Sequence, residues 1–214
     1  MFESLKSRKP RIVDEGGYRK SAVVIPLIER NEQYHVLFEV RSSSLKTQPG
    51  EVCFPGGGCE DKESAEQTAV REICEELLID RDQIELIAPA DIFVSPFNMM
   101  IYPFIGILKQ YKGTYSKDEV QEVFTVPLDF FMNHRPQVWT QQVRIEPAED
   151  FPWDKVPGGE KYPWRRGKYS VNFYEYKRKG KSPRIIWGIT AKIMENAASL
   201  LREEAGVKES EGDI

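Results

Sequence analysis

Residues 57–79 read GGCEDKESAEQTAVREICEELLI and contain an unusual density of glutamates. At about 100° per residue along a helix, the apolar residues and the glutamates of this stretch separate onto different sides. The face expected to pack comprises Val70, Ile73, Cys74 and Leu77. The opposite face comprises Glu72, Glu75 and Glu76. One side of the predicted helix therefore packs on a core, and the other presents three carboxylates together.

The start of this helix is indicated by Ser64, which is followed three residues later by Gln67. This is the spacing of a capping box, in which each side chain accepts a hydrogen bond from the other residue's backbone. Carboxylates at such close helical spacing repel one another by about 0.2–0.5 kcal/mol per pair. Two interpretations of the cluster remain open at this point: a solvated acidic face, or ligands for a divalent cation.

The residues that lead into the helix favour the second interpretation. Phe54 and Pro55 are followed by three consecutive glycines, Gly56, Gly57 and Gly58. A glycine loop before a helix lets backbone approach a ligand closely and lets amides face an anion. A phosphate-compatible loop beside an acidic helix suggests a phosphate bridged by a metal ion.

The spacing of Gly57, Glu63 and the run from Arg71 to Ile79 resembles the box of the Nudix family, G-x5-E-x7-R-E-U-x-E-E-x-G-U, where U is bulky and aliphatic. One position departs from this pattern, because Leu78 stands where the box has glycine. That position commonly takes a left-handed conformation that leucine disfavours. We therefore expect the helix to end differently here or to continue past Leu77.

The resemblance implies an α/β fold, the Nudix-type α/β/α sandwich with a mixed β-sheet. It also implies an enzyme in which water attacks a diphosphate linkage with Mg2+ or Mn2+ as cofactor. The implied metal ligands are Glu63, Glu72, Glu75 and Glu76. The implied catalytic residues are Glu72, Glu75, Glu76, Arg71 and Glu122. Arg71 is expected to orient a glutamate, and the general base is left open between a helix glutamate, Glu119 and Glu122.

A second motif lies upstream of the box and concerns the substrate. Residues 37–42 (LFEVRS), Lys46, Gly50 and residues 54–57 (FPGG) resemble the signature of the coenzyme A diphosphatase branch, L-L-T-x-R-S-x3-R-x3-G-x3-F-P-G-G. Glu39 replaces a threonine of that signature and Lys46 replaces an arginine, which keeps the charge but loses the bidentate fork. The implied substrate-binding residues are Arg41, Lys46, Phe54, Pro55, Gly56 and Gly57.

The implied substrate is coenzyme A or an acyl-CoA, which would be split into 3′-phosphoadenosine 5′-phosphate and (acyl-)4′-phosphopantetheine. Another nucleoside diphosphate derivative, such as ADP-ribose or a dinucleotide, remains an alternative. A hypothesis of a different class is a Nudix-fold module that binds a nucleotide without cleaving it. The complete glutamate set argues against a pure binder, because binding alone does not need a site with four carboxylates.

The remaining pattern predicts the elements around this helix. Residues 21–28 and 34–41 are apolar and β-branched, and the polar residues between them predict a hairpin. Further strands are expected at 84–94, 100–108 and 120–126, with a short helix from Pro127 to Met132. Residues 188–204 carry an apolar stripe at helical spacing. Strands with helices on both faces predict a three-layer α/β/α sandwich.

The chain organisation expected from this pattern is one domain at 21–205 between an N-terminal tail, 1–20, and a C-terminal tail, 206–214. A basic, aromatic insertion is expected at about 147–185. Between positions 151 and 185 the chain has ten Lys or Arg and three Asp or Glu, although the whole chain carries a net charge of −4. This stretch could hold an adenine ring and phosphates, or it could be a solvated hairpin with a strand at 169–176.

Composition narrows the class of protein further. Three cysteines, Cys53, Cys59 and Cys74, give neither an even disulfide count nor zinc-ligand spacing, so we interpret them as reduced thiols. The first residues lack the apolar core of a signal peptide, and no apolar run is long enough to span a membrane. We expect a cytoplasmic protein that acts on a small molecule, with no membrane or nucleic-acid partner. A homodimer remains open.

Overall fold

The computed structural model describes residue 6 and residues 12–178 and 180–206. It divides into two compact units, one built from the chain up to His134 and from Ile193 onward, and one spanning Arg135–Lys192. Of the predicted tails, residues 1–5, 7–11 and 207–214 lie outside this described set. The tail predicted at 1–20 overlaps the turn η2 (Glu15–Gly17) and the start of the first strand at Arg19. The second unit begins before the insertion expected at 147–185 and ends after it.

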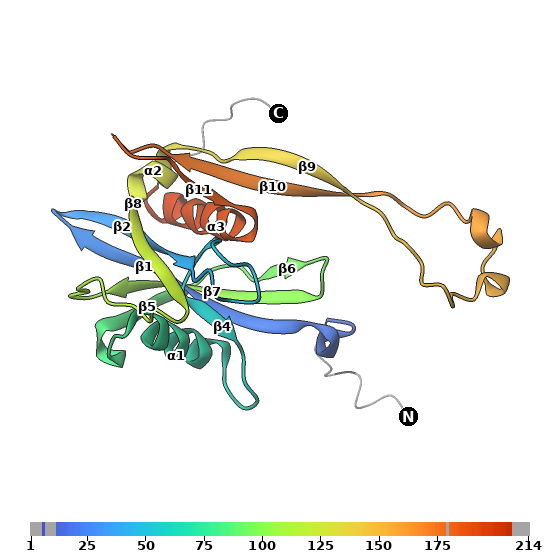
Figure 1. The fold of residues 1–214 in the computed structure, drawn as a ribbon, viewed down its shortest axis with the longest axis horizontal. Coiled ribbons are helices and arrows are strands. Elements are labelled where there is room, and N and C mark those ends of the chain that lie inside the picture. Colours follow the sequence, from blue (N-terminus) through green and yellow to red (C-terminus); the bar gives the residue numbers. More distant parts are fainter. Residues whose placement is uncertain (1–5, 7–11, 179, 207–214) are drawn as a thin grey trace. The chain divides into compact units, whose positions relative to one another are not determined.

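The first unit is built on a mixed sheet (Figure 1). Within the described residues the sheet has eight strands in the order β3-β2-β1-β7-β5, with β4 pairing β1, β6 pairing β7 and β8 pairing β2. The long strands β1 and β7 run parallel, and the other pairs are antiparallel. The strands are β1 (Arg19–Arg30), β2 (Gln33–Arg41), β3 (Val52–Cys53), β4 (Gly56–Gly58), β5 (Ile84–Pro89), β6 (Phe93–Ser95), β7 (Met99–Leu108) and β8 (Val120–Pro127).

Helices cover both faces of this sheet, as the sequence predicts. Side chains alternate along β2, so that Leu37 packs with Ile73 and Leu77 of α1 (Ala65–Leu77). Phe38 points to the other face and stacks on Phe54 at 5.0 Å between ring centroids. On that face lie α2 (Leu128–Asn133) and the part of α3 (Gly188–Glu204) that belongs to the first unit (Figure 1). The α/β/α sandwich is therefore confirmed.

The second unit is a small antiparallel sheet, in the order β11-β10-β9. Its strands are β9 (Gln137–Val143), β10 (Gly167–Tyr176) and β11 (Arg184–Trp187). Of these strands, the sequence predicts only β10. It does not predict β9, because every residue of β9 before its last is exposed and the strand has no apolar face. Aromatic rings pack together near the short helical turns η4 (Trp153–Lys155) and η5 (Gly159–Lys161), with Tyr162 and Trp164 at 4.9 Å.

The hairpin of β1 and β2 is confirmed, with Leu27 opposite Val36 and Arg30 opposite Gln33. The strand expected at 84–94 is instead two strands, β5 and β6. Among the described helices, none is both long and apolar enough to cross a membrane.

Candidate active site

The glutamate-rich stretch begins α1 with the capping box that the sequence predicts. Gln67 N donates to Ser64 Oγ at 3.2 Å, and Ser64 N donates to Gln67 Oε1 at 2.9 Å. Both bonds satisfy backbone donors that have no partner inside the helix. They fix the first turn, and with it the rotation that decides where each glutamate points.

The end of α1 differs from our expectation. The helix ends at Leu77, and Leu78 adopts the left-handed conformation itself, with φ 52° and ψ 54°. Its backbone N–H donates to the carbonyl of Cys74, and Thr114 Oγ1 donates to the Leu77 carbonyl at 2.7 Å. The expectation of a different helix end was wrong, because these contacts hold a leucine where glycine would fit without strain.

We predicted that the three glutamates of α1 lie together on the side away from the core. The structure shows that they do not. Glu76 is only 6% exposed and is buried with Ile73 and Leu77. The side chain of Glu72 is 17% exposed, and that of Glu75 is 58% exposed. The carboxylates therefore form a series from the interior to the surface, and the prediction was wrong for Glu76.

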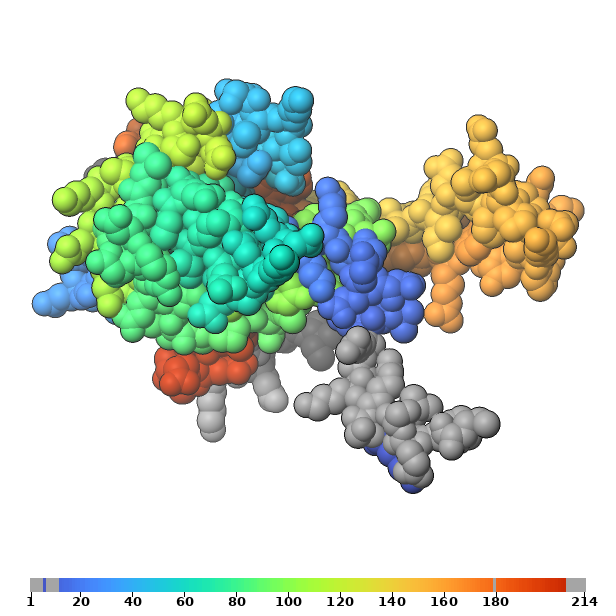
Figure 2. Space-filling model, turned by 90° about the horizontal axis from the view of Figure 1, so that it is seen from below, coloured from blue at the N-terminus to red at the C-terminus, as the bar shows by residue number. Residues whose placement is uncertain are grey.

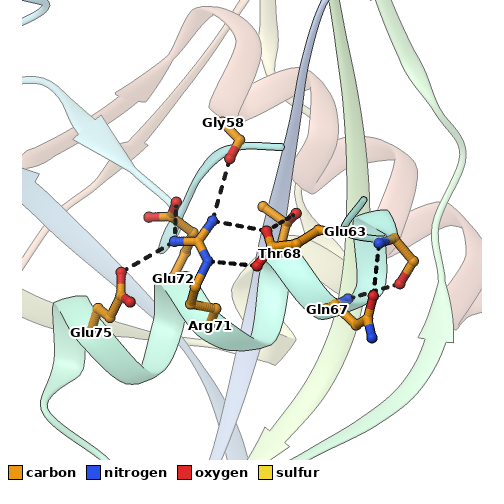
Figure 3. A network of polar contacts seen from close by, with 8 residues as sticks. Gly58, Glu63, Gln67, Thr68, Arg71, Glu72 and Glu75 are labelled. Atoms are coloured by element: carbon orange, nitrogen blue, oxygen red, sulfur yellow. Dashed lines mark hydrogen bonds and ion pairs between the residues drawn. The ribbon is translucent and has the colours of Figure 1, made fainter. Parts of the chain in front are cut away.

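Arg71 connects Glu63, Glu72 and Glu75 (Figure 3). Its Nε donates to Glu63 Oε1 at 3.0 Å, and its Nη1 donates to Glu72 Oε1 at 2.8 Å and to Glu75 Oε2 at 3.2 Å. Thr68 Oγ1 also donates to Glu63, at 2.9 Å. Hydrogen bonds from Arg71 and Thr68 lower the pKa of Glu63. The arginine thus offsets the repulsion between neighbouring carboxylates and orients Glu72, as the sequence predicts.

The glycines before α1 are used differently from the loop that we expected. They form β4, which pairs with β1 through Val23 and Gly56 among others. Gly56 N donates to Glu76 Oε2 at 2.7 Å, so this amide is already bonded to a side chain. A Cβ on Gly57 would lie 2.3 Å from Glu72 Cδ. The expectation of free amides that face an anion was wrong at Gly56, and these glycines instead let two carboxylates approach the backbone.

Burial dominates the electrostatics of the inner carboxylates, Glu72 and Glu76. Burial, together with the charges of Glu72 and Glu119, raises the pKa of Glu76 to about 8, against the hydrogen bond from Gly56. Burial also raises the pKa of Glu72, against the hydrogen bond and charge of Arg71. Without a cation, these groups therefore favour the protonated form more strongly than an exposed glutamate does.

Glu39 is an inner carboxylate that sequence reasoning treated only as a departure from the upstream motif. It is 1% exposed in β2, and its Oε1 has no hydrogen-bond partner among the described residues. Burial raises its pKa well above the usual range, and the neighbouring charge of Glu76 raises it further. The signal that could have found it was a charged residue inside an otherwise apolar strand.

The residues of the upstream motif have different surroundings, and Arg41 is the one whose charge acts on the inner carboxylates. The positive charge of Arg41 favours the ionised forms of Glu39 and Glu76, so Arg41 lies close to both carboxylates. Lys46 is exposed in the loop 42–51. This loop lies beside the segment before β8 (Figure 2), and Ser42 N of the loop donates to the Glu119 carbonyl of that segment at 2.8 Å. Phe54 is 4% exposed and packs in the core.

Two further predicted residues have other surroundings. The Pro55 carbonyl accepts a hydrogen bond from Val24 N at 2.9 Å, which joins it to β1. Glu122 pairs with Val40 across β2 and β8, whereas Glu39 pairs with Val123. Because directly opposed residues point to the same face, Glu122 lies on the face away from α1. The charge of Glu119, the other candidate for the general base, acts on Glu72 and Glu76 of α1.

The residues that could hold a divalent cation are hard oxygen donors, which suits Mg2+ or Mn2+. Among the residues that the structure describes, no three Asp, Glu, His or Cys side chains converge as an assembled metal site. The reason lies in their partners: Arg71 attracts Glu63, Glu72 and Glu75, and Gly56 N binds Glu76. The three cysteines, including the half-buried Cys53, are free thiols, as we expected.

Several known proteins are similar to this chain. Residues 17–148 match the family described as NUDIX domain. The peroxisomal coenzyme A diphosphatase NUDT7 of Mus musculus is 37% identical over 134 residues, which are 62% of this chain and 56% of that protein. The chloroplastic Nudix hydrolase 22 of Arabidopsis thaliana is 31% identical over 188 residues, 86% of this chain and 55% of that protein. The chain thus spans about half the length of these two curated relatives.

A solved structure of a MutT/nudix family protein from Enterococcus faecalis is similar in fold. It has a TM-score of 0.50 and 13% sequence identity, and the match covers 92% of this chain and 66% of that one. At this identity the likeness concerns the fold alone.

Proposed function

The chain belongs to the Nudix family, and from this premise we propose that it hydrolyses the diphosphate linkage of coenzyme A or an acyl-CoA. The products would be 3′-phosphoadenosine 5′-phosphate and (acyl-)4′-phosphopantetheine. The name of the mouse relative, a coenzyme A diphosphatase, supports this substrate. The upstream motif supports it independently, because its spacing from Arg41 to Gly57 is that of the coenzyme A diphosphatase signature.

One observation carries the proposal: the charge of Arg41, from the upstream motif, acts on Glu39 and Glu76, at the inner end of the carboxylate series. Residues that are distant in the sequence, from the substrate motif and from the glutamate helix, therefore share one region. A guanidinium beside a carboxylate cluster suits a diphosphate, because the cation binds phosphate oxygens while the carboxylates hold metal.

A divalent cation fits this region on the chemistry of the donor set. Burial is the main cause of the raised pKa values of Glu72 and Glu76. Nearby carboxylates add to it, Glu75 and Glu119 for Glu72, and Glu72 and Glu119 for Glu76, and a cation would offset that repulsion. We propose Glu72, Glu75 and Glu76 as its ligands, with Glu63 in support, and Mg2+ or Mn2+ as the metal. When bound, such a cation neutralises phosphate charge and lowers the pKa of bound water.

The other residues would position these groups. Arg71 would hold Glu72 in place through the bond from Nη1 at 2.8 Å. Gly56 N would hold Glu76 in the same way, at 2.7 Å. For the general base we favour Glu119 over Glu122, because the charge of Glu119 already acts on Glu72 and Glu76. The cytoplasmic location and the homodimer stay predictions.

The experiment that tests this function is incubation of the purified chain with coenzyme A and Mg2+, followed by mass spectrometry of both products. We expect both products to appear and to require the metal. Glu72→Gln and Glu76→Gln should each lower turnover about a hundredfold or more, since each removes a ligand charge. A protein that binds the nucleotide but releases neither product would instead be a binding module.

A further inference from the structure

Glu39 is a carboxylate at a buried position in the sheet, where an apolar residue is usual. It lies in the interior of β2, opposite Cys53 of β3 and Val123 of β8. Its side chain is almost completely buried, and its Oε1 has no hydrogen-bond partner among the described residues. A buried polar group without a partner costs about 1–3 kcal/mol, and more when it carries charge. A hydrophobic residue would serve the strand better.

The strand geometry shows which way this carboxylate points. Side chains two apart in a strand share a face, so Glu39 points to the same side as Leu37. Leu37 belongs to the core cluster that contains Ile73 and Leu77 of α1. Glu76 lies between those two residues on α1 and interacts with Glu39 by charge and by a side-chain hydrogen bond. The carboxyl groups of Glu39 and Glu76 therefore meet between the sheet and α1.

The charges around this pair do not balance within the protein. Glu119 adds a further negative charge that acts on both Glu39 and Glu76. Arg41 is the cation whose charge acts on both, and its Nε donates to the Thr47 carbonyl at 3.3 Å. Three carboxyl groups and one guanidinium thus act on one another here, and the guanidinium is partly engaged elsewhere.

We propose that Glu39 is a further ligand for the divalent cation, so that β2 and α1 hold the metal between them. This inference rests on the proposed function, which supplies the cation. Hard cations such as Mg2+ and Mn2+ take carboxylate oxygens, and the unpartnered Oε1 of Glu39 is such an oxygen. A ligand from the sheet would also fix the metal relative to Arg41, which lies two residues further along the same strand.

The inference is tested by Mn2+ titration of the full chain without substrate, with free Mn2+ measured by electron paramagnetic resonance. Glu39→Gln keeps the side-chain volume and removes the charge, so the fold should remain. We expect this variant to bind Mn2+ about tenfold or more weakly than the wild type. Glu29→Gln is the matched control, because Glu29 is an exposed glutamate on the neighbouring strand β1. Its affinity for Mn2+ should equal that of the wild type.

A second variant separates this inference from the proposed function. Glu76→Gln should weaken Mn2+ binding whether or not Glu39 is a ligand. Wild-type affinity in Glu39→Gln, together with weakened affinity in Glu76→Gln, would overturn the role of Glu39 and leave the proposed function standing. Unchanged affinity in both variants would overturn the metal site itself, and with it the proposed function.

Discussion

Neighbouring carboxylates in this protein differ in burial and in hydrogen bonding, and their spacing in the sequence does not reveal these differences. Glu75 is mostly exposed on the outer side of α1, whereas Glu76, the next residue, is buried and bonded to Gly56 N. A buried carboxylate with a raised pKa is stable as the acid and costs free energy as the anion. The metal-free protein should therefore respond to pH chiefly through its inner glutamates.

We predict that the stability of the metal-free protein falls as pH rises from 4.5 to about 8. In the unfolded chain Glu76 loses its proton near its ordinary pKa of 4.5, whereas in the folded protein it keeps the proton up to about 8. The folded state binds more protons in this window, so the free energy of unfolding decreases with pH, by on the order of 5 kcal/mol. Urea denaturation in EDTA at several pH values measures it.

Glu76→Gln should flatten this pH dependence, because glutamine does not titrate and can still accept the hydrogen bond from Gly56. The exposed Glu66, which lies on the same helix, provides the control variant Glu66→Gln, and this variant should keep the wild-type slope. Saturating Mg2+ should reduce the loss at pH 8, since the cation favours the ionised carboxylates. A Glu76→Gln protein with the wild-type slope would contradict the burial argument.

The two glycines of β4 provide a second prediction at the residue scale. A Cβ on Gly56 would lie 2.3 Å from the Ala22 carbonyl oxygen, which is backbone, so Gly56→Ala should destabilise the fold by about 2 kcal/mol or more. A Cβ on Gly57 would meet the carboxyl end of Glu72, which can rotate away. Gly57→Ala should therefore keep most of the stability and lose about tenfold to a hundredfold in turnover. Thermal unfolding and steady-state kinetics measure the contrast; equal thermal losses would refute it.

At the scale of elements, α1 is defined by local signals at its start and by tertiary contacts at its end. The capping box of Ser64 and Gln67 is contained in four consecutive residues, which is why the sequence predicts it correctly. Leu78 is held in a left-handed conformation by contacts from Thr114, which is distant in the sequence. Its side chain is 59% exposed and contributes little packing to offset this strain.

We predict that Leu78→Gly stabilises the protein. A left-handed conformation costs about 1–2 kcal/mol for a residue with a Cβ, and the entropy of glycine takes back part of that gain. The net increase should be about 0.5–1 kcal/mol, or about 1–4 °C in Tm. Leu78→Ala is the control: it removes the same exposed side chain but keeps the Cβ, so it should show no such increase. A lower Tm for Leu78→Gly than for Leu78→Ala would contradict this account.

Other elements show where sequence reasoning ends. The hairpin of β1 and β2 follows from two apolar runs, but β9 has no apolar face and is held by pairing with β10. Hydrophobic periodicity identifies strands that bury one face against a core, and β9 buries no face. The burial of Glu76 and Glu39 likewise depends on how α1 packs against β2. A helical wheel of α1 does not include that packing. The box therefore predicts the helix and its residue types, and the sheet determines which carboxylates are inside.

At the scale of the whole molecule, charge is distributed unevenly along the chain. The segment from Phe151 to Ile185 is strongly basic, although the chain as a whole is acidic. Arg165, Arg166 and Lys168 are exposed within it. Coenzyme A differs from its dephospho form by one 3′-phosphate, which is a group that such cations recognise.

We predict that replacing Arg165, Arg166 and Lys168 by alanine raises the KM for coenzyme A more than the KM for dephospho-CoA. Each charge-assisted hydrogen bond lost, at about 1.5–3 kcal/mol, corresponds to tenfold or more in affinity. The control is the double variant Lys177→Ala and Lys181→Ala, because these lysines are exposed in the same unit. Equal KM changes for both substrates would instead favour a solvated hairpin.

The central claim, that this Nudix protein is a coenzyme A diphosphatase, is tested most directly by one competition assay. The purified chain is given coenzyme A, ADP-ribose and a dinucleotide at equal concentrations with Mg2+, and all products are quantified over time by mass spectrometry. The account predicts that 3′-phosphoadenosine 5′-phosphate and 4′-phosphopantetheine appear first and in equal amounts. Faster hydrolysis of ADP-ribose or of the dinucleotide would contradict the claim.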